Sequence, residues 1–420
     1  MEKSIRARRD WAASVALMMT ILIGMPLFAA SPAHANGSIA IGSGSLALPT
    51  PGARYIYVST TGSDTHTEYK EWLKGDRVYG RLNCLVDPNW KKTTSQEFCP
   101  EPDRANPLRT IKLAIRAARP GDVIVVRAGT YVEAAGWGAV PAKADARVTL
   151  QSMPTERVIL SGTLLLKGAD YWTVQGIRFV YNSTVQTGQT VVGISGGRGW
   201  ELRNNEIRGS RGVANLLVNS LKPTSTSLEA KTAAAPHDFL ISGNTIHTNA
   251  GVGTHGTFHN IYLMSTIYSR GGVIERNLFG NAPRGAHIKA AAASASSADQ
   301  SPRNVIIRYN TMHSSASGVT IGLKATGIVV ERNLIARQVN GTQYDGGVKT
   351  YKLEKPGSNA VRDNLISGYA RMIEEDGGVT EHIFARRNST AATKFTGTVA
   401  AGDLSPAWYS QRIAYGREAR

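Results

Sequence analysis

The chain has 420 residues, and its 48 Lys and Arg against 31 Asp and Glu give a formal net charge of +17. By length alone the chain holds one or two domains. The charge favours polyanionic partners, but the sequence has no nucleic-acid-binding motif and no cluster of basic residues interleaved with aromatics, so nucleic acid is excluded as the expected partner.

Residues 1–35 have the pattern of a secretory signal peptide. A basic start precedes the mostly apolar run 11–28, and Ala33 and Ala35 supply the small residues of a cleavage site. A retained membrane anchor is the alternative, but Pro26 interrupts the run, and no other stretch is long and apolar enough to span a membrane. Cleavage near Ala35 predicts a secreted or periplasmic protein with 44 basic and 29 acidic residues, a net charge of +15. An acidic polysaccharide or an anionic cell envelope would be the natural polyanion for such a protein.

Residues 36–106 lie between the predicted signal peptide and the predicted helix. Residues 36–53 are rich in Gly, Ser, Ala and Pro and predict a flexible leader. Residues 55–64 predict a strand that runs into a turn, and residues 65–106 predict an irregular insertion. The insertion contains Cys84 and Cys99, the only cysteines, which we expect to form a disulfide in a secreted chain because a metal site would need more ligands nearby.

Residues 107–118 predict a helix, since Ile111, Ala114, Ile115 and Ala118 fall on one helical face. That face would cover the open end of a first coil.

The following segments predict strands and loops. A first strand pair is expected over 119–131 and early coils over 147–180. Residues 221–236 and 290–302, rich in small and polar residues, predict surface loops, and residues 391–420 show no repeat and are expected to cover the last coil.

One phrase repeats along residues 198–390. It consists of an apolar residue, two variable positions, an Asn, one variable position and another apolar residue. Its asparagines are Asn205, Asn244, Asn277, Asn310, Asn333, Asn364 and a degenerate copy at Asn388. Their spacings of 39, 33, 33, 23, 31 and 24 residues indicate a solenoid unit of about two dozen residues, with loops added in the longer copies. The flanking Val, Ile and Leu alternate with polar residues, which is typical of strands, and the two helical runs of a helical repeat are missing.

An Asn at one place in every unit predicts a bend between short strands. There it would adopt the left-handed backbone conformation and pass amide hydrogen bonds along the stack. With these asparagines, and with Pro120, Gly121 and Asp122 after the predicted helix, the sequence resembles the pectate-lyase-like superfamily over residues 54–390. The resemblance implies an all-β fold, a right-handed parallel β-helix solenoid with an N-terminal capping helix, followed by a C-terminal cap or tail at 391–420.

A further short strand follows each asparagine and predicts a polar wall. The residues expected to point inward are Ile261, Leu263, Ile288, Val319, Ile321 and Val348. Alternation then directs outward Asn260, Tyr262, His287, Lys289, Thr320, Lys349 and Tyr351, with Lys324 at the edge. Because neighbouring strands lie about 4.8 Å apart, a long polymer could lie along this wall and contact one coil after another.

The densest part of the wall runs from His259 to Tyr262 and, one coil later, from Arg284 to Lys289. These two phrases resemble a group of secreted bacterial β-helix proteins, and related lyases use a basic residue as the base beside a uronate carboxylate. The resemblance implies β-elimination on an acidic polysaccharide. Lys289, partly desolvated beside Arg284 and Lys349, would be the base, with His287 or His259 as rivals, and Tyr262 would protonate the leaving oxygen. The expected substrate-binding residues are His259, Asn260, Lys349, Tyr351 and Lys324.

Other activities stay open at this point. The same residues could serve a uronate C5-epimerase, and Asp238 stands in a Pro-His-Asp phrase similar to that of alginate epimerases. Asp345 and the run 374–376 are the acidic candidates for a calcium site or a hydrolase acid–base pair, but no aspartate cluster is found, so calcium is possible and no metal is assured. The missing polygalacturonase signatures count against hydrolysis. A non-catalytic solenoid that binds glycans or the cell envelope is the remaining alternative, and the oligomeric state is not predicted.

Overall fold

The computed structural model describes residues 52–64, 104–136, 138–185, 190–251, 257–294, 299–337, 346–353, 358–375, 383–399, 405–406 and 414–417. All of them belong to one compact unit, Ile39–Arg420. The expected signal peptide, nearly all of the leader, and Cys84 and Cys99 lie outside these residues. Within the described part of the chain, no helix has the length and apolarity needed to cross a membrane.

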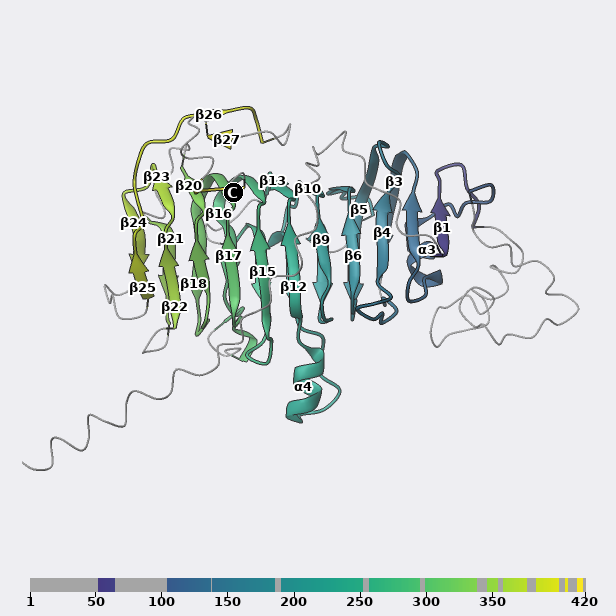
Figure 1. Cartoon of the computed structure of the whole chain (residues 1–420), viewed down its shortest axis with the longest axis horizontal. Helices are drawn as coiled ribbons and strands as arrows, with labels where there is room; N and C mark the ends of the chain where they lie inside the picture. Colours follow the sequence, from purple (N-terminus) through teal and green to yellow (C-terminus); the bar gives the residue numbers. More distant parts are fainter. Residues whose placement is uncertain are drawn as a thin grey trace, which may run out of the picture. The chain divides into compact units, whose positions relative to one another are not determined.

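The strands wind into a solenoid with three faces, and each turn of the solenoid is called a coil. Face 1 is a parallel sheet of eleven strands in chain order, which stand side by side in Figure 1. They are β1 (Tyr55–Val58), β2 (Val123–Val126), β4 (Val148–Ser152), β6 (Trp172–Gln175), β9 (Glu201–Arg203), β12 (His237–Ser242), β15 (Gly271–Glu275), β17 (Val305–Arg308), β19 (Val329–Glu331), β22 (Asn359–Arg362) and β25 (Ile383–Arg386).

A second parallel sheet, of fourteen strands, supplies faces 2 and 3. It divides because long strands pair with one set of neighbours at their first half and with another set at their second half. These long strands are β5 (Val158–Lys167), β16 (Leu278–Ala290) and β18 (Thr311–Gly322), and β3 (Gly129–Ala135) pairs with β5 along its whole length. Face 2 adds β7 (Arg178–Val180), β10 (Glu206–Arg208), β13 (Thr245–His247), β20 (Leu334–Ala336) and β23 (Leu365–Ser367), and face 3 adds β8 (Val192–Ser195), β11 (Ala214–Asn219), β14 (His259–Met264), β21 (Gly346–Tyr351) and β24 (Arg371–Glu375).

This pairing is that of the predicted parallel β-helix, and the right-handed solenoid fold class is confirmed. Each coil runs from face 1 through face 2 to face 3, so consecutive coils bring like strands into register. The six residues expected to point inward are all fully buried in a single apolar core. Larger side chains join them, including Trp200 and Phe239, whose rings stack 4.9 Å apart.

The asparagine ladder is confirmed at the corner between faces 1 and 2. The Asn277 side-chain amide donates to Asn310 Oδ1 at 3.0 Å and to the Ile241 carbonyl at 2.9 Å. The Asn277 Oδ1 in turn accepts from the backbone and side-chain amides of Asn244. Asn205 to Asn388 repeat this pattern, so the ladder satisfies buried polar groups that the bend would otherwise leave without partners.

The backbone conformation of the ladder differs from the prediction by one residue. The left-handed residue is the one before each asparagine. These residues are Asn204, Gly243, Arg276, Tyr309, Arg332, Asp363 and Arg387, with φ between 51° and 68°. The preceding residue therefore makes the sharp turn, and the asparagine keeps its amide directed along the stack.

The predicted capping helix is α3 (Ile111–Ala117), and its apolar face packs against β1, β2 and β3. The Thr110 hydroxyl accepts the Leu113 N–H, and the Glu133 carboxylate accepts the N–H groups of Ile111 and Lys112 at 2.8 and 3.0 Å. These acceptors satisfy donors that the first turn of a helix leaves unpaired.

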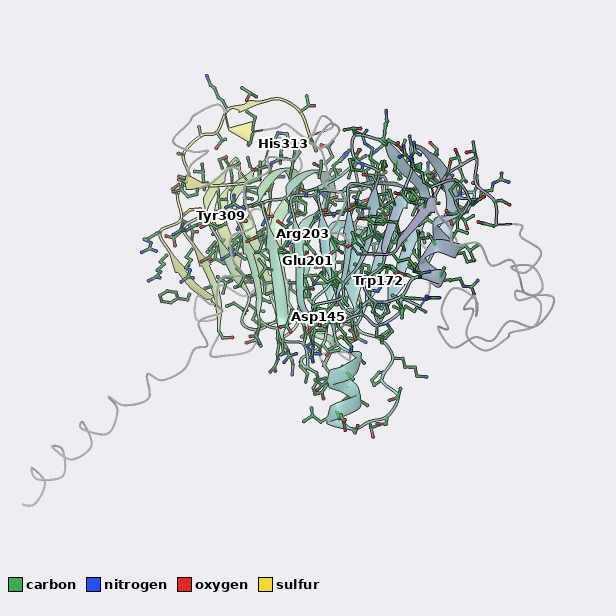
Figure 2. All side chains as sticks on the ribbon, turned by 45° about the vertical axis from the view of Figure 1, so that its right-hand side comes forward. Asp145, Trp172, Glu201, Arg203, Tyr309 and His313 are labelled. Atoms are coloured by element: carbon green, nitrogen blue, oxygen red, sulfur yellow. The ribbon has the colours of Figure 1, made fainter. Side chains whose placement is uncertain are left out.

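The segment 391–420 was expected to cover the last coil. Its described residues include the antiparallel pair of β26 (Phe395–Thr396) and β27 (Ser405–Pro406), and they contact face 2 at β18, β20 and β23. The ring of Phe395 lies edge-on to the ring of His313, which is labelled in Figure 2, with 5.1 Å between the ring centroids. Phe395 and Tyr415 cover the apolar cluster Leu334, Ala336 and Leu365.

The outer side of face 1 carries ion pairs within and between strands. Glu201 and Arg203 lie beside each other on β9 (Figure 2). Further along, Arg308 and Glu275 pair at 2.8 Å. Exposed pairs of this kind contribute little to stability.

Candidate functional site

The outward residues of face 3 form one row across six strands. Strand pairing places them in register in the order Leu217, Tyr262, Lys289, Thr320, Lys349 and Glu374. We call this set the Lys289 row. Neighbouring residues of the row are one strand apart, about 4.8 Å. The row therefore has the spacing predicted for a wall that a chain-like ligand could contact.

Lys289 is the half-buried cation of the row. Its Nζ lies 4.8 Å from the centroid of the Tyr262 ring, and burial lowers the pKa of Lys289. Among the described residues no carboxylate pairs with Lys289. A lysine in such surroundings is more readily deprotonated than an exposed one, which is the property required of a base.

The Tyr262 hydroxyl donates a hydrogen bond to the Ala292 carbonyl at 3.1 Å. The residue is 7% exposed, and burial raises the pKa of the Tyr262 hydroxyl. Since its proton already points to the backbone, the structure favours a different role from the predicted proton donor. The ring supports the Lys289 ammonium.

On the other side of Lys289 the row is polar, and its side chains are held by neighbouring groups. Lys349 Nζ lies 3.2 Å from the Glu374 carboxylate, so its charge is partly balanced. The Thr320 hydroxyl shares a hydrogen bond with Ser317. Tyr351 lies two residues after Lys349 on β21, and its ring is so close to Gly322 on the paired strand that a Cβ there would lie 2.1 Å from a ring carbon.

Asn260 and His287 are corrections to the predicted wall. Both are fully buried at the corner between faces 2 and 3. The Asn260 amide contacts His287 Nδ1 at 2.9 Å, and Asn215 donates to Asn260 Oδ1 at 2.8 Å, so the three side chains form a second internal ladder. Burial lowers the pKa of His287 to about 3, with the nearby His313 adding to the effect. A neutral, inaccessible imidazole cannot act as the base.

His259 is likewise 2% exposed, and its Nδ1 accepts the Ala286 N–H at 3.0 Å. It therefore belongs to the packing of the corner, and direct binding of a polymer by His259 is not supported.

Arg284 and Lys324 lie at the margins of the row. Arg284 is half-buried in the bend of β16, and the next residue, Gly285, approaches the preceding coil so closely that a Cβ would lie 1.8 Å from the Phe258 carbonyl oxygen. Lys324 is exposed in the turn after β18, with φ of 66°.

The acidic candidates do not form a metal site in the part of the chain that the structure describes. Asp345 and Asp376 lie outside that part, and Glu374 pairs with Lys349. No group of three or more potential ligands occurs among the described residues. Asp238 sits at a bulge of β12 on face 1, where it pairs with Arg270 at 3.3 Å, so its phrase is not part of the Lys289 row.

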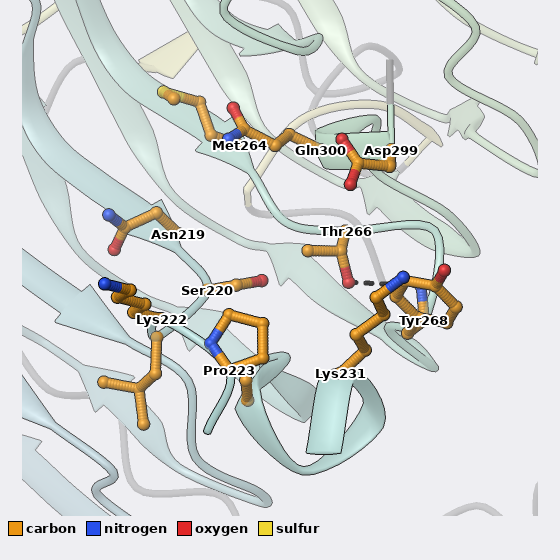
Figure 3. A pocket seen from close by; sticks show the side chains of 12 residues that line it. Asn219, Ser220, Lys222, Pro223, Lys231, Met264, Thr266, Tyr268, Asp299 and Gln300 are labelled. Carbon is orange, nitrogen blue, oxygen red and sulfur yellow. Dashed lines mark hydrogen bonds between the residues drawn. The ribbon is translucent and has the colours of Figure 1, made fainter. Parts of the chain in front are cut away.

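A cavity of about 390 Å³ opens at the end of β11 and β14 (Figure 3). Hydrophobic patterning did not predict this cavity, because residues 221–236 have the composition of a surface loop. They contain α4 (Leu228–Ala234), which projects beyond β12 in Figure 1. The available signal was the pair Ser227 and Glu229. Ser227 caps the helix by accepting the Ala230 N–H, and Glu229 lies in the first turn.

Comparison with known proteins gives similarity in architecture. No family model and no curated protein matches the chain. Among solved structures, it is similar to "The complex structure of XylC with xylose", with a TM-score of 0.48 and 12% identity over 84% of this chain and 73% of that one.

Two further similar structures are pectate lyase Pel9A and the A-module of the mannuronan C-5 epimerase AlgE6 from Azotobacter vinelandii. The first has a TM-score of 0.44 and 13% identity over 85% of this chain and 84% of the other. The second has a TM-score of 0.34 and 14% identity over 68% and 95%. At these values the similarities assign neither a family nor an activity to this chain.

Proposed function

We propose that this chain is a secreted or periplasmic lyase that cleaves a uronate-containing polysaccharide by β-elimination along face 3. One observation carries the proposal. The outward row of face 3 contains Lys289, whose pKa is lowered by burial and whose Nζ rests on the Tyr262 ring without a carboxylate partner among the described residues. The net charge of the chain supports an acidic polymer as its ligand.

In the proposed reaction the neutral Lys289 amine removes the proton from C5 of a uronate unit. The electron pair of the C5–H bond moves first toward the carboxylate and then forms the C4–C5 double bond as the C4–O bond breaks. Arg284 would neutralise the carboxylate as charge develops on it. The Lys289 ammonium produced in the first step would return its proton to the leaving oxygen, so the base is restored without Tyr262 as an acid.

The residues of the row argue against hydrolysis and leave epimerisation and non-catalytic binding as alternatives. Hydrolysis with inversion or retention requires two carboxyl groups that flank the scissile bond. In the described part of the Lys289 row only Glu374 is acidic, and it is paired with Lys349. Epimerisation would use the same base without loss of the leaving group, and a non-catalytic binding wall would use the same charges without a base. A requirement for calcium is possible, and the experiment below tests it by adding calcium or a chelator.

The test is absorbance near the unsaturated-uronate band, with purified mature protein on a panel of polyuronates and glycosaminoglycans, with and without calcium or chelator. A rise with one polymer, lost in Lys289→Met and kept in Lys324→Ala, is the expected result. Absence of a rise on every polymer would overturn the lyase proposal. Proton exchange at C5, new reducing ends and retention on immobilised polymer would then separate epimerase, hydrolase and binder.

A further inference from the structure

The cavity at the end of face 3 adjoins the Lys289 row. Asn219 and Met264 line it, and they pair with each other in register two residues beyond the pair Leu217 and Tyr262. Two residues along a strand span about 6.6 Å, comparable to the size of one sugar ring. A sugar unit bound at Tyr262 and Lys289 therefore lies about one ring length from the cavity, measured along the strands.

Both sides of the cavity are fixed by backbone hydrogen bonds. On one side the Leu221 N–H donates to the Ala234 carbonyl at 2.8 Å and closes the loop that carries α4. On the other side the Ile267 N–H donates to the Asp299 carbonyl at 2.9 Å. A pre-formed cavity of this kind reduces the entropy cost of ordering a ligand.

The lining has the composition of a sugar site. Tyr268 offers an aromatic ring, against which the C–H face of a sugar can pack. The amides of Asn219 and Gln300 both donate and accept, as the neighbouring hydroxyls of a sugar require. The Asn219 amide is oriented by Ser195, whose hydroxyl donates to Asn219 Oδ1 at 2.6 Å. Ser220 also lines the cavity (Figure 3), and its hydroxyl is buried with no partner among the described residues.

Charge narrows the class of sugar. Lys222 and Lys231 line the cavity against one carboxylate, Asp299, so the lining carries one net positive charge. Lys231 Nζ lies 5.5 Å from the centroid of the Tyr268 ring, which holds an ammonium beside the aromatic platform. An anionic sugar that stacks on Tyr268 would place its carboxylate near this ammonium.

We propose that this cavity is a subsite for a single uronate unit, next to the unit that reacts at Lys289. The assignment rests on the proposed function for its substrate class, but it concerns binding and does not require that Lys289 be a base. Tyr268 supplies the stacking surface, Lys231 receives the carboxylate, Lys222 adds positive charge to the lining, and Asn219 and Gln300 orient the ring hydroxyls.

The test measures binding by calorimetry in a Lys289→Met background, where no turnover occurs. The probes are trimers of galacturonate, guluronate and mannuronate, each compared with its methyl ester. We expect the acid to bind more tightly than its ester, at least fivefold weaker binding of both forms by Tyr268→Ala, and loss of the preference for the acid in the Lys222→Ala/Lys231→Ala double variant. Leu228→Ala, on α4 but 67% exposed and outside the cavity lining, is the matched control and should bind as the parent does.

The outcomes separate this assignment from the proposed reaction. Binding that needs Tyr268 in a protein that forms no unsaturated product would retain the subsite and remove the lyase. Product formation with Tyr268→Ala binding as the parent does would retain the lyase and overturn the subsite. Equal affinity for acid and ester, or no saturable binding of any trimer, would also overturn it.

Discussion

Lys289 and Tyr262 stand directly opposite each other on neighbouring strands, with the lysine nitrogen 4.8 Å from the centroid of the tyrosine ring. The ring excludes water from one side of the ammonium and attracts the cation through its π-face. Burial is the larger influence, since the pKa of Lys289 is lowered. The Tyr262 ring thus holds the Lys289 ammonium on face 3, at a position where burial also makes the ammonium easier to deprotonate.

Replacing Lys289 by Met should lower the rate of β-elimination by about 10² to 10⁴, the range that a general base contributes. The same change should raise the free energy of unfolding at pH 7, because the folded state no longer buries an ammonium. Initial rates and urea unfolding of the same preparation check both effects. A variant that lost activity and stability together would point to a structural role for the lysine.

The rate should rise with pH and level off below the ordinary lysine pKa of about 10.4, because only the neutral amine accepts the C5 proton and burial favours that form. The measurement is kcat/KM as a function of pH on a defined trimer. In Tyr262→Phe, which keeps the ring, the profile should keep its position. A Lys289-dependent rate that was independent of pH from 6 to 10 would contradict the assignment of the base.

His287 should make the protein less stable in mild acid. Its folded-state pKa of about 3 lies below the ordinary value of about 6.5, so the unfolded state binds more protons between these values. The contribution of His287 to stability is therefore complete above pH 6.5 and is lost as pH falls toward 3, by up to about 1.4 kcal/mol per pH unit.

Urea unfolding at pH 7 and pH 5 measures this dependence, and His287→Asn is the matched variant because it continues the ladder of Asn215 and Asn260. The difference between the two pH values should shrink by about 2 kcal/mol in the variant. His237, whose pKa is also lowered by burial, contributes in the same direction and is present in both proteins. An unchanged difference would show that His287 titrates normally.

The asparagine ladder should be most sensitive in its middle. Asn277→Ala removes the acceptor for two donors of Asn244 and the donor to the Ile241 carbonyl, so it should cost about 3 kcal/mol. Asn388 has a ladder neighbour on one side only among the described residues and is partly exposed, so Asn388→Ala should cost about 1 kcal/mol. Equal losses in denaturant titrations would contradict a stack of linked amides.

Phe395→Ala should uncover face 2. The ring packs against the cluster of Leu334, Ala336 and Leu365 and against His313, so its removal should lower stability by about 1 to 2 kcal/mol. Limited proteolysis should cut the C-terminal segment faster in this variant than in Phe384→Ala, whose side chain is 58% exposed. Identical cleavage would show that the segment is held elsewhere.

The architecture could be predicted from the sequence because the apolar residues recur at the positions that pack in the core. Ile261, Ile288, Val319 and Val348 alternate with polar residues on four successive coils, and all four are fully buried. Loss of any one would expose the core, so the pattern is unambiguous. The asparagines were equally informative, because each must satisfy the same buried donors.

The site was predicted less well because alternation fails where a strand bends. His259 and Asn260 are adjacent and both buried, since the chain turns the corner between faces 2 and 3 there. Period-two counting therefore directed Asn260 and His287 outward, whereas it placed Tyr262 and Lys289 correctly. The hydrogen bond from Tyr262 to Ala292 and the cavity beside α4 depend on loop conformation, which hydrophobic patterning does not encode.

The ladder also bears on how such a protein can diversify. Within the ladder each asparagine bonds to the asparagines directly before and after it, whether 23 residues separate them, as from Asn310 to Asn333, or 39, as from Asn205 to Asn244. The longer interval accommodates α4 and one side of the cavity without any change in the ladder geometry. Residues can therefore be inserted or lost in the loops between the strands without disturbing the hydrogen bonds of the ladder. Natural variation can change the ligand-facing loops while the coils keep their structure.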